Sequence, residues 1–173
     1  LDLPRLEDFQ HEIRNRLLAK LWTGPERALV TLPTGAGKTR VAVETIRDWL
    51  IGATNQGQLT RRTIVWLAHT EELCEQAHEC FRQVWEDAIH VVPAALARYW
   101  GPYCTNGDAT DELASSFDDP CIIISTPQRM VSLMEGEIDE ALRRSLTAHL
   151  GLVIVDEAHR AAAPTYRLSL IHI

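Results

Sequence analysis

Residues 31–39 read TLPTGAGKT, a run whose glycines, lysine and hydroxyl have the spacing that suits a phosphate group. Gly35 and Gly37 allow backbone N–H groups to curl round an anion. Lys38 would reach the outer phosphates of a nucleotide, and the Thr39 hydroxyl would ligate Mg²⁺. We refer to residues 31–39 as the phosphate loop. It predicts that the chain binds ATP together with Mg²⁺.

The residues on either side of the phosphate loop have contrasting patterns. Residues 27–32 predict a strand, and residues 40–46 repeat apolar side chains with helical periodicity. Strand, loop and helix in this order form the context that such a motif requires, because the start of the helix adds its partial positive charge. Lys38 is expected to act in catalysis as well as in binding. The loop residues expected to contact the nucleotide are Pro33, Thr34, Gly35, Ala36, Gly37, Lys38 and Thr39.

A second group of chemically active residues follows another apolar run. Residues 151–155 predict a buried parallel strand, and residues 156–159 after it read DEAH. Ligands of open α/β sheets bind beyond the carboxyl ends of the strands, so we expect Asp156 to face the same crevice as the phosphate loop. There Asp156 would hold Mg²⁺ and Glu157 would activate the attacking water. His159 is expected near the γ-phosphate.

Two further segments complete a pattern. Residues 66–76 read WLAHTEELCEQ, and residues 124–130 read ISTPQRM. With the phosphate loop and DEAH, in this order, they make the chain resemble the DEAD/DEAH-box ATPases of helicase superfamily 2, in particular their first RecA-like domain. The resemblance covers nearly the whole chain and looks closest to the motor subunits of type I and type III restriction enzymes. It implies an ATP-dependent helicase or translocase that acts on DNA.

The resemblance also implies where nucleic acid would bind. In this family the two segments, known as Ia and Ib, touch the nucleic acid backbone. The residues that match are His69, Thr70, Ser125, Thr126 and Pro127. The residues alone allow a simpler interpretation, because Thr70 and Thr126 suit helix N-caps and Pro127 suits a first helical position.

A helix is predicted ahead of the phosphate loop, and it contains Phe9 and Gln10. The family has an aromatic-glutamine pair here that recognises adenine, so the resemblance implies that Gln10 reads the base. Its amide offers the donor and the acceptor that the adenine edge requires. The family's arginine three positions earlier is Glu7 in this chain, so Arg5 or Arg14 would have to substitute. The alternative is that Gln10 is an ordinary solvent-facing helix residue.

Alternating strand and helix patterns predict an α/β fold of the RecA-like P-loop NTPase type, with a mainly parallel sheet covered by helices on both faces. The chain has 173 residues and is 46% hydrophobic, which suits one compact domain. Residues 100–120 are expected to be an irregular surface excursion. The expected strands lie near residues 27–32, 63–68, 121–125 and 151–155.

The resemblance implies that the domain is incomplete at its C-terminal end. We expect residues 1–168 to be the first RecA-like domain, truncated after DEAH, and residues 169–173 to be a non-native tail or an ordinary apolar continuation. In the family a second RecA-like domain supplies arginines that contribute roughly a thousand-fold to a hundred-thousand-fold to phosphoryl transfer. We therefore expect this chain to bind ATP but to hydrolyse it poorly. The expected partners are DNA, that second domain, and a nuclease or specificity subunit.

Composition leaves these hypotheses open. The net charge of −7 does not exclude a nucleic acid, because binding depends on local Lys and Arg side chains. The four cysteines form no C-x-x-C pair, so reduced thiols are expected and zinc is not. No apolar run has membrane-spanning length, so a cytoplasmic protein without a membrane partner is expected. Two alternatives stay open: an RNA helicase of the same superfamily, and an ATP-sensing scaffold that binds a protein partner.

Overall fold

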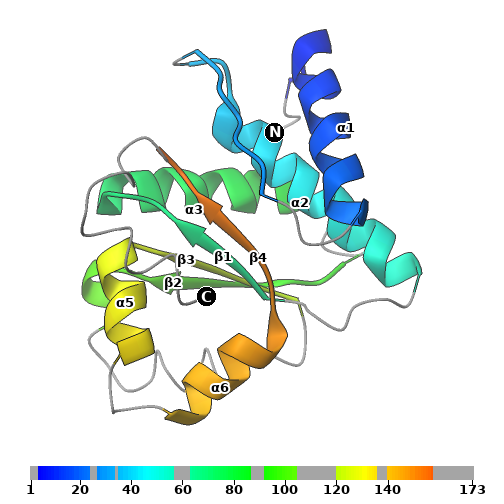
Figure 1. Ribbon diagram of the computed structural model, residues 1–173. Coiled ribbons are helices and arrows are strands. Elements are labelled where there is room, and N and C mark those ends of the chain that lie inside the picture. The colour runs from blue at the N-terminus through cyan, green and yellow to red at the C-terminus, as the bar shows by residue number, and fades with distance from the viewer. Residues whose placement is uncertain are drawn as a thin grey trace. The chain divides into compact units, whose positions relative to one another are not determined.

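The computed structural model describes residues 4–23, 27–33, 35–56, 63–86, 92–104, 120–135 and 140–157 (Figure 1). The chain divides into two compact units, and each is described by itself. The first unit comprises Leu1–Leu59 and Glu79–Val92, and the second comprises Thr60–His78 and Pro93–Ile173. The predicted tail at residues 169–173 lies outside the described residues.

A parallel sheet of four strands, in the order β2-β3-β1-β4, forms the centre of the second unit. All five residues of β1 and all five of β3 are buried. Their sequences, TIVWL and CIIIS, are nearly continuous hydrophobic runs rich in β-branched residues, as a parallel strand covered on both faces requires. The strands are β1 (Thr63–Leu67), β2 (Ala95–Tyr99), β3 (Cys121–Ser125) and β4 (Leu150–Val155).

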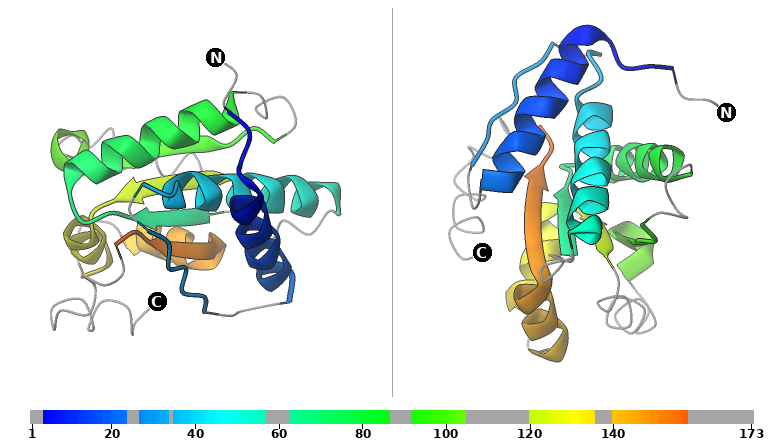
Figure 2. Two further views of the ribbon diagram at one scale, coloured as in Figure 1. Left: turned by 90° about the horizontal axis from the view of Figure 1, so that it is seen from above. Right: turned by 90° about the vertical axis from the view of Figure 1, so that its right-hand side faces the viewer.

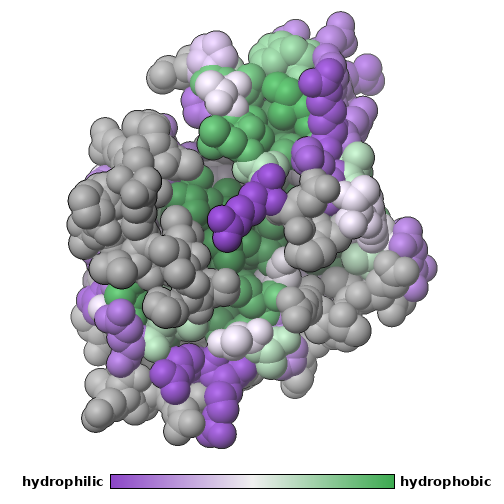
Figure 3. Space-filling view, viewed as in Figure 1, coloured by the Kyte–Doolittle hydropathy of each residue, from purple (hydrophilic) through white to green (hydrophobic). Residues whose placement is uncertain are grey.

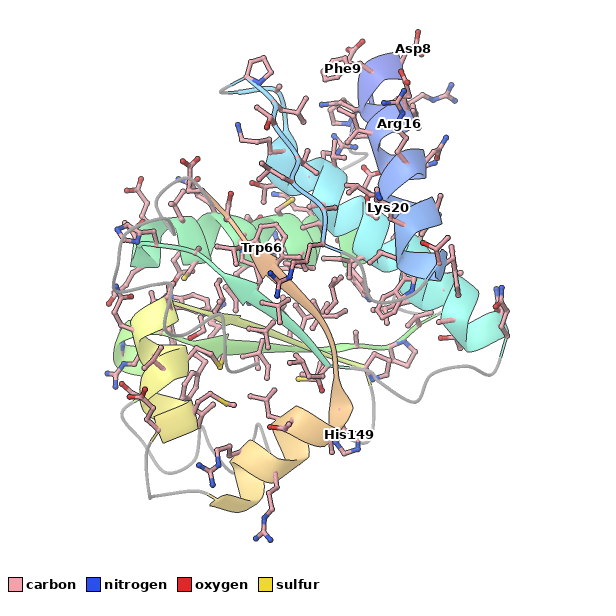
Figure 4. All side chains as sticks on the ribbon, in the orientation of Figure 1. Asp8, Phe9, Arg16, Lys20, Trp66 and His149 are labelled. Carbon is pink, nitrogen blue, oxygen red and sulfur yellow. The ribbon has the colours of Figure 1, made fainter. Side chains whose placement is uncertain are left out.

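One face of this sheet packs against α5 (Pro127–Glu135) and α6 (Glu140–His149). Burying each large side chain in that core stabilises the fold by about 1.5–3 kcal/mol relative to leaving it in water. Side chains alternate along a strand, so the neighbouring residues face the other way, and these are buried too, including Trp66, which Figure 4 labels. The core on the α5 and α6 side consists of Val65, Leu67, Tyr99, Cys121, Ile123, Met130, Leu133 and Leu146.

The predicted strands at residues 63–68, 121–125 and 151–155 are confirmed as β1, β3 and β4. Strand β2 was not predicted, because its sequence ALARY is rich in alanine, which has a low β-propensity. The predicted surface excursion is wrong at its start. Trp100 is only 1% exposed, and a short 3-10 helix, η1 (Gly101–Cys104), follows it. Residues 105–119 lie outside the described residues.

Strand β4 differs from the prediction in its burial. It pairs in parallel with β1, as expected, but it is only partly buried. Within the described residues it lies at one end of the strand order, so one of its edges has no described strand beside it. The pairing shifts from Thr63 opposite Leu150 to Ile64 opposite Leu152, which makes Gly151 the extra residue of a β-bulge.

Helices α1 (Asp8–Thr23) and α2 (Lys38–Asn55) pack against each other in the first unit (Figure 2). A Cβ atom at Gly52 of α2 would lie 2.7 Å from Cζ2 of Trp22, so the absence of a side chain there lets the indole of α1 rest on α2. Figure 3 shows hydrophobic atoms of this unit at the surface beside the hydrophilic side of α1.

The predicted strand at residues 27–32 is wrong. Residues 27–33 form neither helix nor strand, and Leu29 is 80% exposed. The run has the apolar composition of a strand, but a strand is stabilised by hydrogen bonds to a neighbour. No described strand pairs with this segment. Local pattern alone therefore does not produce the strand.

Helix α3 (Glu71–Trp85) contributes its residues up to His78 to the second unit and those from Glu79 onward to the first. Its buried residues recur every three or four positions, as expected of a helix with one apolar face. Cys74, Ala77 and Phe81 are fully buried, whereas Leu73 is only partly buried. Among the described helices, none is long and apolar enough to cross a bilayer.

Candidate nucleotide and nucleic-acid site

The phosphate loop lies in the first unit, directly before α2. Gly35 and Gly37 have φ angles of 79° and 74°, in the left-handed region where a residue with a side chain is strained. The Ala36 N–H donates to the carbonyl of Pro33 at 3.2 Å and closes the turn. Gly37 offers no side chain to cap α2, so the first N–H groups of this helix receive no acceptor from their cap. Such an arrangement suits an anion.

Lys38 folds back over the phosphate loop. Its Nζ donates to the carbonyl oxygens of Leu32, at 2.9 Å, and Pro33, at 3.2 Å. Phosphate oxygens would be stronger acceptors for this ammonium group than neutral carbonyls are. The next residue, Thr39, lies in the first turn of α2. Thr34 lies outside the described residues.

Gln10, the candidate adenine reader, contacts the phosphate loop. Its Nε2 donates to the carbonyl of Ala36 at 2.9 Å, and its Oε1 accepts from the Glu7 N–H at 2.8 Å. A Cβ atom at Gly37 would lie 2.7 Å from the same Nε2. The first unit therefore brings Gln10 to the phosphate loop, a contact that the sequence did not predict, while its role towards adenine stays a prediction.

Arg14, one of the arginines considered as a substitute in adenine recognition, is engaged with α2. Its Nη1 lies 3.3 Å from Asp48 and 3.9 Å from Glu44. Glu44 is only 6% exposed and also pairs with Arg40 and Arg47 of its own helix. The carboxylate is thus surrounded by guanidinium groups, which offsets the cost of burying its charge.

The acidic motif lies in the second unit, at the end of β4. The Asp156 N–H donates to the carbonyl of Leu67 at 2.8 Å, which extends the pairing of β4 with β1 by one step. One Asp156 carboxylate oxygen accepts from the Glu157 N–H at 2.9 Å. Glu157 has a φ of 54°, a left-handed conformation that costs a residue with a side chain about 1–2 kcal/mol. His159 lies outside the described residues.

The carboxyl ends of β1, β3 and β4 lie at one edge of the parallel sheet, which we call the carboxyl edge. Just past the strands, the Ala68 N–H donates to the carbonyl of Ser125 at 3.0 Å, as Asp156 does to Leu67. The segments that follow these strands therefore begin side by side. The structure thus brings together the predicted nucleic-acid residues and the acidic motif within the second unit. The expectation that the phosphate loop meets Asp156 over one nucleotide stays a prediction.

The two predicted helix caps at the carboxyl edge are confirmed. Thr70 Oγ1 accepts from the Leu73 N–H at 3.3 Å at the start of α3. Thr126 Oγ1 accepts from the Arg129 N–H at 3.4 Å at the start of α5, where Pro127 is the first helical residue. Both caps leave the earliest N–H groups of their helices directed beyond the sheet.

Ser125 and His69, the other two predicted nucleic-acid residues, are less accessible. The Ser125 hydroxyl is fully buried and donates to the carbonyl of Tyr99 at 2.7 Å, so it fastens the ends of β3 and β2 together. His69 is half-buried in the turn between β1 and α3.

A contact between Arg98 of β2 and Tyr103 of η1 was missed, because that strand was not predicted. The guanidinium of Arg98 lies 5.0 Å from the ring centroid of Tyr103, and its Nε donates to His78 at 3.1 Å. Tyr103 is 38% exposed. The dense aromatic run RYWGPY at residues 98–103 was the available signal.

The cysteines described with their side chains are free thiols: Cys74, Cys80 and Cys121. Burial raises the pKa of Cys80 to about 11, although the nearby Arg40 opposes that shift. Burial alone raises the pKa of Cys121 to about 12. Within the described ranges, no three His, Cys, Asp or Glu side chains form a group that could hold a metal ion.

Residues 3–172 match the ResIII family, described as the res subunit of type III restriction enzymes. The chain belongs to this family. The ResIII match places it among the ATP-binding domains of superfamily 2 helicases, so the resemblance noted from its motifs is confirmed. Its fold is the expected α/β, RecA-like one, with a parallel sheet.

Relatives of this ResIII chain include named helicases and a nuclease. It is 28% identical over 162 residues to the ATP-dependent DNA helicase mph1 of Aspergillus terreus, an alignment that covers 92% of the chain and 12% of mph1. It is 29% identical over 136 residues to the Endoribonuclease Dicer homolog 3b of Oryza sativa subsp. japonica, covering 77% of the chain and 7% of that protein. The chain spans about a fifth or less of the length of the curated relatives that it matches.

A solved structure shares the fold. It is a nuclease-deletion mutant of the Type ISP restriction-modification enzyme LlaGI, in complex with a DNA substrate mimic. The TM-score is 0.58 at 14% identity, and the match covers 94% of this chain and 16% of LlaGI.

Proposed function

We propose that this ResIII domain is the ATP-binding half of an ATP-dependent DNA helicase or translocase. The observation that carries the proposal is the phosphate loop. Two left-handed glycines, Gly35 and Gly37, and an uncapped helix start lie beside an ammonium group that is held on carbonyl oxygens. Groups of this kind bind the phosphates of a nucleoside triphosphate.

The chemical roles follow from the residue types. Lys38 and the loop N–H groups would hold the phosphates, and Thr39 and Asp156 would hold Mg²⁺. The metal would neutralise charge on the phosphate oxygens. Glu157 would orient and deprotonate the attacking water, and His159 would lie beside the γ-phosphate. The left-handed backbone at Glu157 supports this role, because strained residues with a side chain tend to be retained where function requires them.

Nucleic acid would bind at the carboxyl edge. The starts of α3 and α5, capped by Thr70 and Thr126, present N–H groups that suit backbone phosphates. His69 and Pro127 would contact the bound nucleic acid strand. The buried Ser125 would hold the segment between β3 and α5 in position. The hydrogen bond from Asp156 to Leu67, two residues before His69, ties the acidic motif to the first of these loops. A movement of Asp156 upon ATP hydrolysis would therefore shift the loop after β1, where nucleic acid would bind.

A second RecA-like domain would complete the proposed motor, and a nuclease or specificity subunit is the remaining partner that we propose. The superfamily relatives named as helicases support a motor rather than an ATP-sensing scaffold. The relative named as an endoribonuclease favours RNA as the second candidate substrate.

Two measurements test this proposal on the chain. The first is the affinity for a fluorescent ATP analogue with Mg²⁺. Lys38→Ala should weaken it about tenfold to a hundredfold, because one charge-assisted contact to phosphate is lost. The matched control is Lys20→Ala, on the last turn of α1, which should leave affinity unchanged. Equal affinity of the Lys38 variant and the wild type would contradict the phosphate site.

The second measurement compares single-stranded DNA with RNA of the same sequence, by fluorescence anisotropy at several salt concentrations. Thr126→Ala should weaken binding of DNA, and the salt dependence should report phosphate contacts. Preference for RNA would instead indicate contacts to the 2′-hydroxyl and favour the second candidate. An absence of binding to either would favour the scaffold.

A further inference from the structure

Gln10 uses both hydrogen-bonding atoms of its amide on the chain's own backbone. Nε2 donates to Ala36 in the phosphate loop, and Oε1 accepts from the N–H of Glu7. Glu7 directly precedes α1 and Gln10 is the third helical residue, so the Oε1 contact is half of a capping box. Reading adenine would require both atoms at once, because the base edge needs one donor and one acceptor. Nε2 keeps a second N–H and Oε1 a second lone pair, but the two backbone bonds already fix the orientation of the amide before any base is present.

We propose that Gln10 is a positioning residue that holds the Ala36–Gly37 peptide in its phosphate-binding orientation, irrespective of the base. The proposal rests on ATP binding by the phosphate loop. Peptide bonds are planar, and none of those described is cis. In a trans peptide the carbonyl and the N–H lie in the same plane and point in opposite directions, so the Gly37 N–H points away from the Ala36 carbonyl. By holding the carbonyl, Gln10 directs the Gly37 N–H to the other side, where it can donate to a phosphate.

The left-handed backbone on either side makes this support useful. Gly35 and Gly37 flank Ala36, and glycine has the widest conformational freedom of any residue. The Ala36–Gly37 peptide can therefore rotate at low cost on its glycine side, which would turn the Gly37 N–H away from the anion. The bond from Gln10 at 2.9 Å opposes that rotation.

Arg14 joins the helix that carries Gln10 to α2. The two residues are one helical turn apart on α1, so they share a face of the helix. Arg14 reaches Asp48 at 3.3 Å and Glu44 at 3.9 Å, and its side chain is 21% exposed. The same helix, α2, begins at the end of the phosphate loop. These ion pairs therefore fix α1 against the element that carries the loop.

The test is a comparison of ligands that differ in the base. Binding of ATP, GTP and inorganic tripolyphosphate, each with Mg²⁺, is measured by calorimetry for the wild-type chain and for Gln10→Met. Methionine is similar in length and uncharged but has no N–H donor. A positioning role predicts that all three ligands weaken by the same factor, about threefold to tenfold, as expected for one lost hydrogen bond. Glu12→Gln, on an exposed part of α1, is the matched control and should change nothing.

Each other outcome has a definite meaning. A loss confined to ATP would overturn the proposal and make Gln10 the adenine reader. No loss with any ligand would overturn it as well. A wild-type chain that binds none of the three would refute the proposed phosphate site itself, which is a different failure.

A double-mutant cycle tests the part played by Arg14. Arg14→Met should weaken the three ligands alike, and Gln10→Met should add little in that background, because the helix no longer holds the amide against Ala36. Circular dichroism confirms that each variant is folded. Fully additive losses would show that Arg14 does not act through Gln10.

Discussion

Adding one methyl group at either glycine of the phosphate loop separates backbone strain from contact with Gln10. Gly35 and Gly37 have nearly equal φ angles, 79° and 74°, so an alanine at either position should cost about 1–2 kcal/mol of strain. The surroundings differ. A Cβ at Gly35 would meet nothing within 4 Å, whereas one at Gly37 would lie 2.7 Å from Nε2 of Gln10. Only Gly37→Ala must displace the amide.

The displaced amide sets the expected difference. Moving Nε2 breaks its bond to the Ala36 carbonyl, a loss of about 0.5–1.5 kcal/mol. Gly37→Ala should therefore lower the free energy of unfolding by about 1 kcal/mol more than Gly35→Ala. In a Gln10→Ala background the two substitutions should cost the same, because there is no amide left to displace.

Urea unfolding of the chain, followed by circular dichroism, measures these differences in the four single and double variants and in the Gln10→Ala parent. Equal costs for Gly35→Ala and Gly37→Ala in the wild-type background would refute the reasoning. So would a difference that persists without Gln10, because the strain at Gly37 would then have another source.

Three other substitutions or treatments have definite expected outcomes. Glu157→Gly should leave the free energy of unfolding unchanged or raise it by up to about 1 kcal/mol in urea melts, whereas the control Glu75→Gly within α3 should lower it by about 1 kcal/mol. Burial raises the pKa of Cys121 from 9.0 to about 12 and that of Cys80 to about 11, so stability from the protonated thiols is fully present below pH 9.0 and is lost as the pH rises through those values. At pH 8 the native thiolate fraction of Cys121 should be about a thousandfold below that of the unfolded chain, and mass spectrometry after iodoacetamide should find this thiol far slower to alkylate than in urea; equal rates would contradict the assigned burial. Ser125→Ala should lower stability by about 1–3 kcal/mol, because its buried bond to β2 is lost, and should leave ATP affinity unchanged in calorimetry.

The elements that the sequence predicts correctly are those in which local pattern and tertiary environment agree. The runs that became β1 and β3 are hydrophobic throughout, and both lie between two other strands. The caps at Thr70 and Thr126 depend only on side chains within one helical turn, so they too are readable from sequence.

The failures occur where burial or pairing depends on distant residues. Residues 27–32 have a strand's composition but no described partner, and Leu29 remains exposed. Strand β2 is the opposite case. Its alanines have a low β-propensity, but pairing with β3 and the burial of Tyr99 stabilise the strand. Periodicity within a short segment contains no information about which strand will lie beside it.

The candidate site shows the same division. Residue type and spacing predict roles for Lys38, Asp156 and Glu157, and these roles stay predictions. The sequence did not predict that Gln10 would contact the carbonyl of Ala36, because that contact joins residues 26 positions apart and depends on how α1 packs on α2.

The described residues with a positive φ lie where the backbone leaves regular structure. They are of two kinds, glycines and one residue with a side chain. Gly35, Gly37 and Gly101 are glycines, at which the left-handed conformation carries little strain. At Gly37 and Gly101 a Cβ would also collide with a neighbouring side chain, so the missing side chain serves the packing. Glu157 has the same kind of backbone but retains a carboxylate. Glycine there would relieve the strain, so the backbone conformation by itself does not favour glutamate. The proposed activation of water by the Glu157 carboxylate is a chemical reason for retaining it.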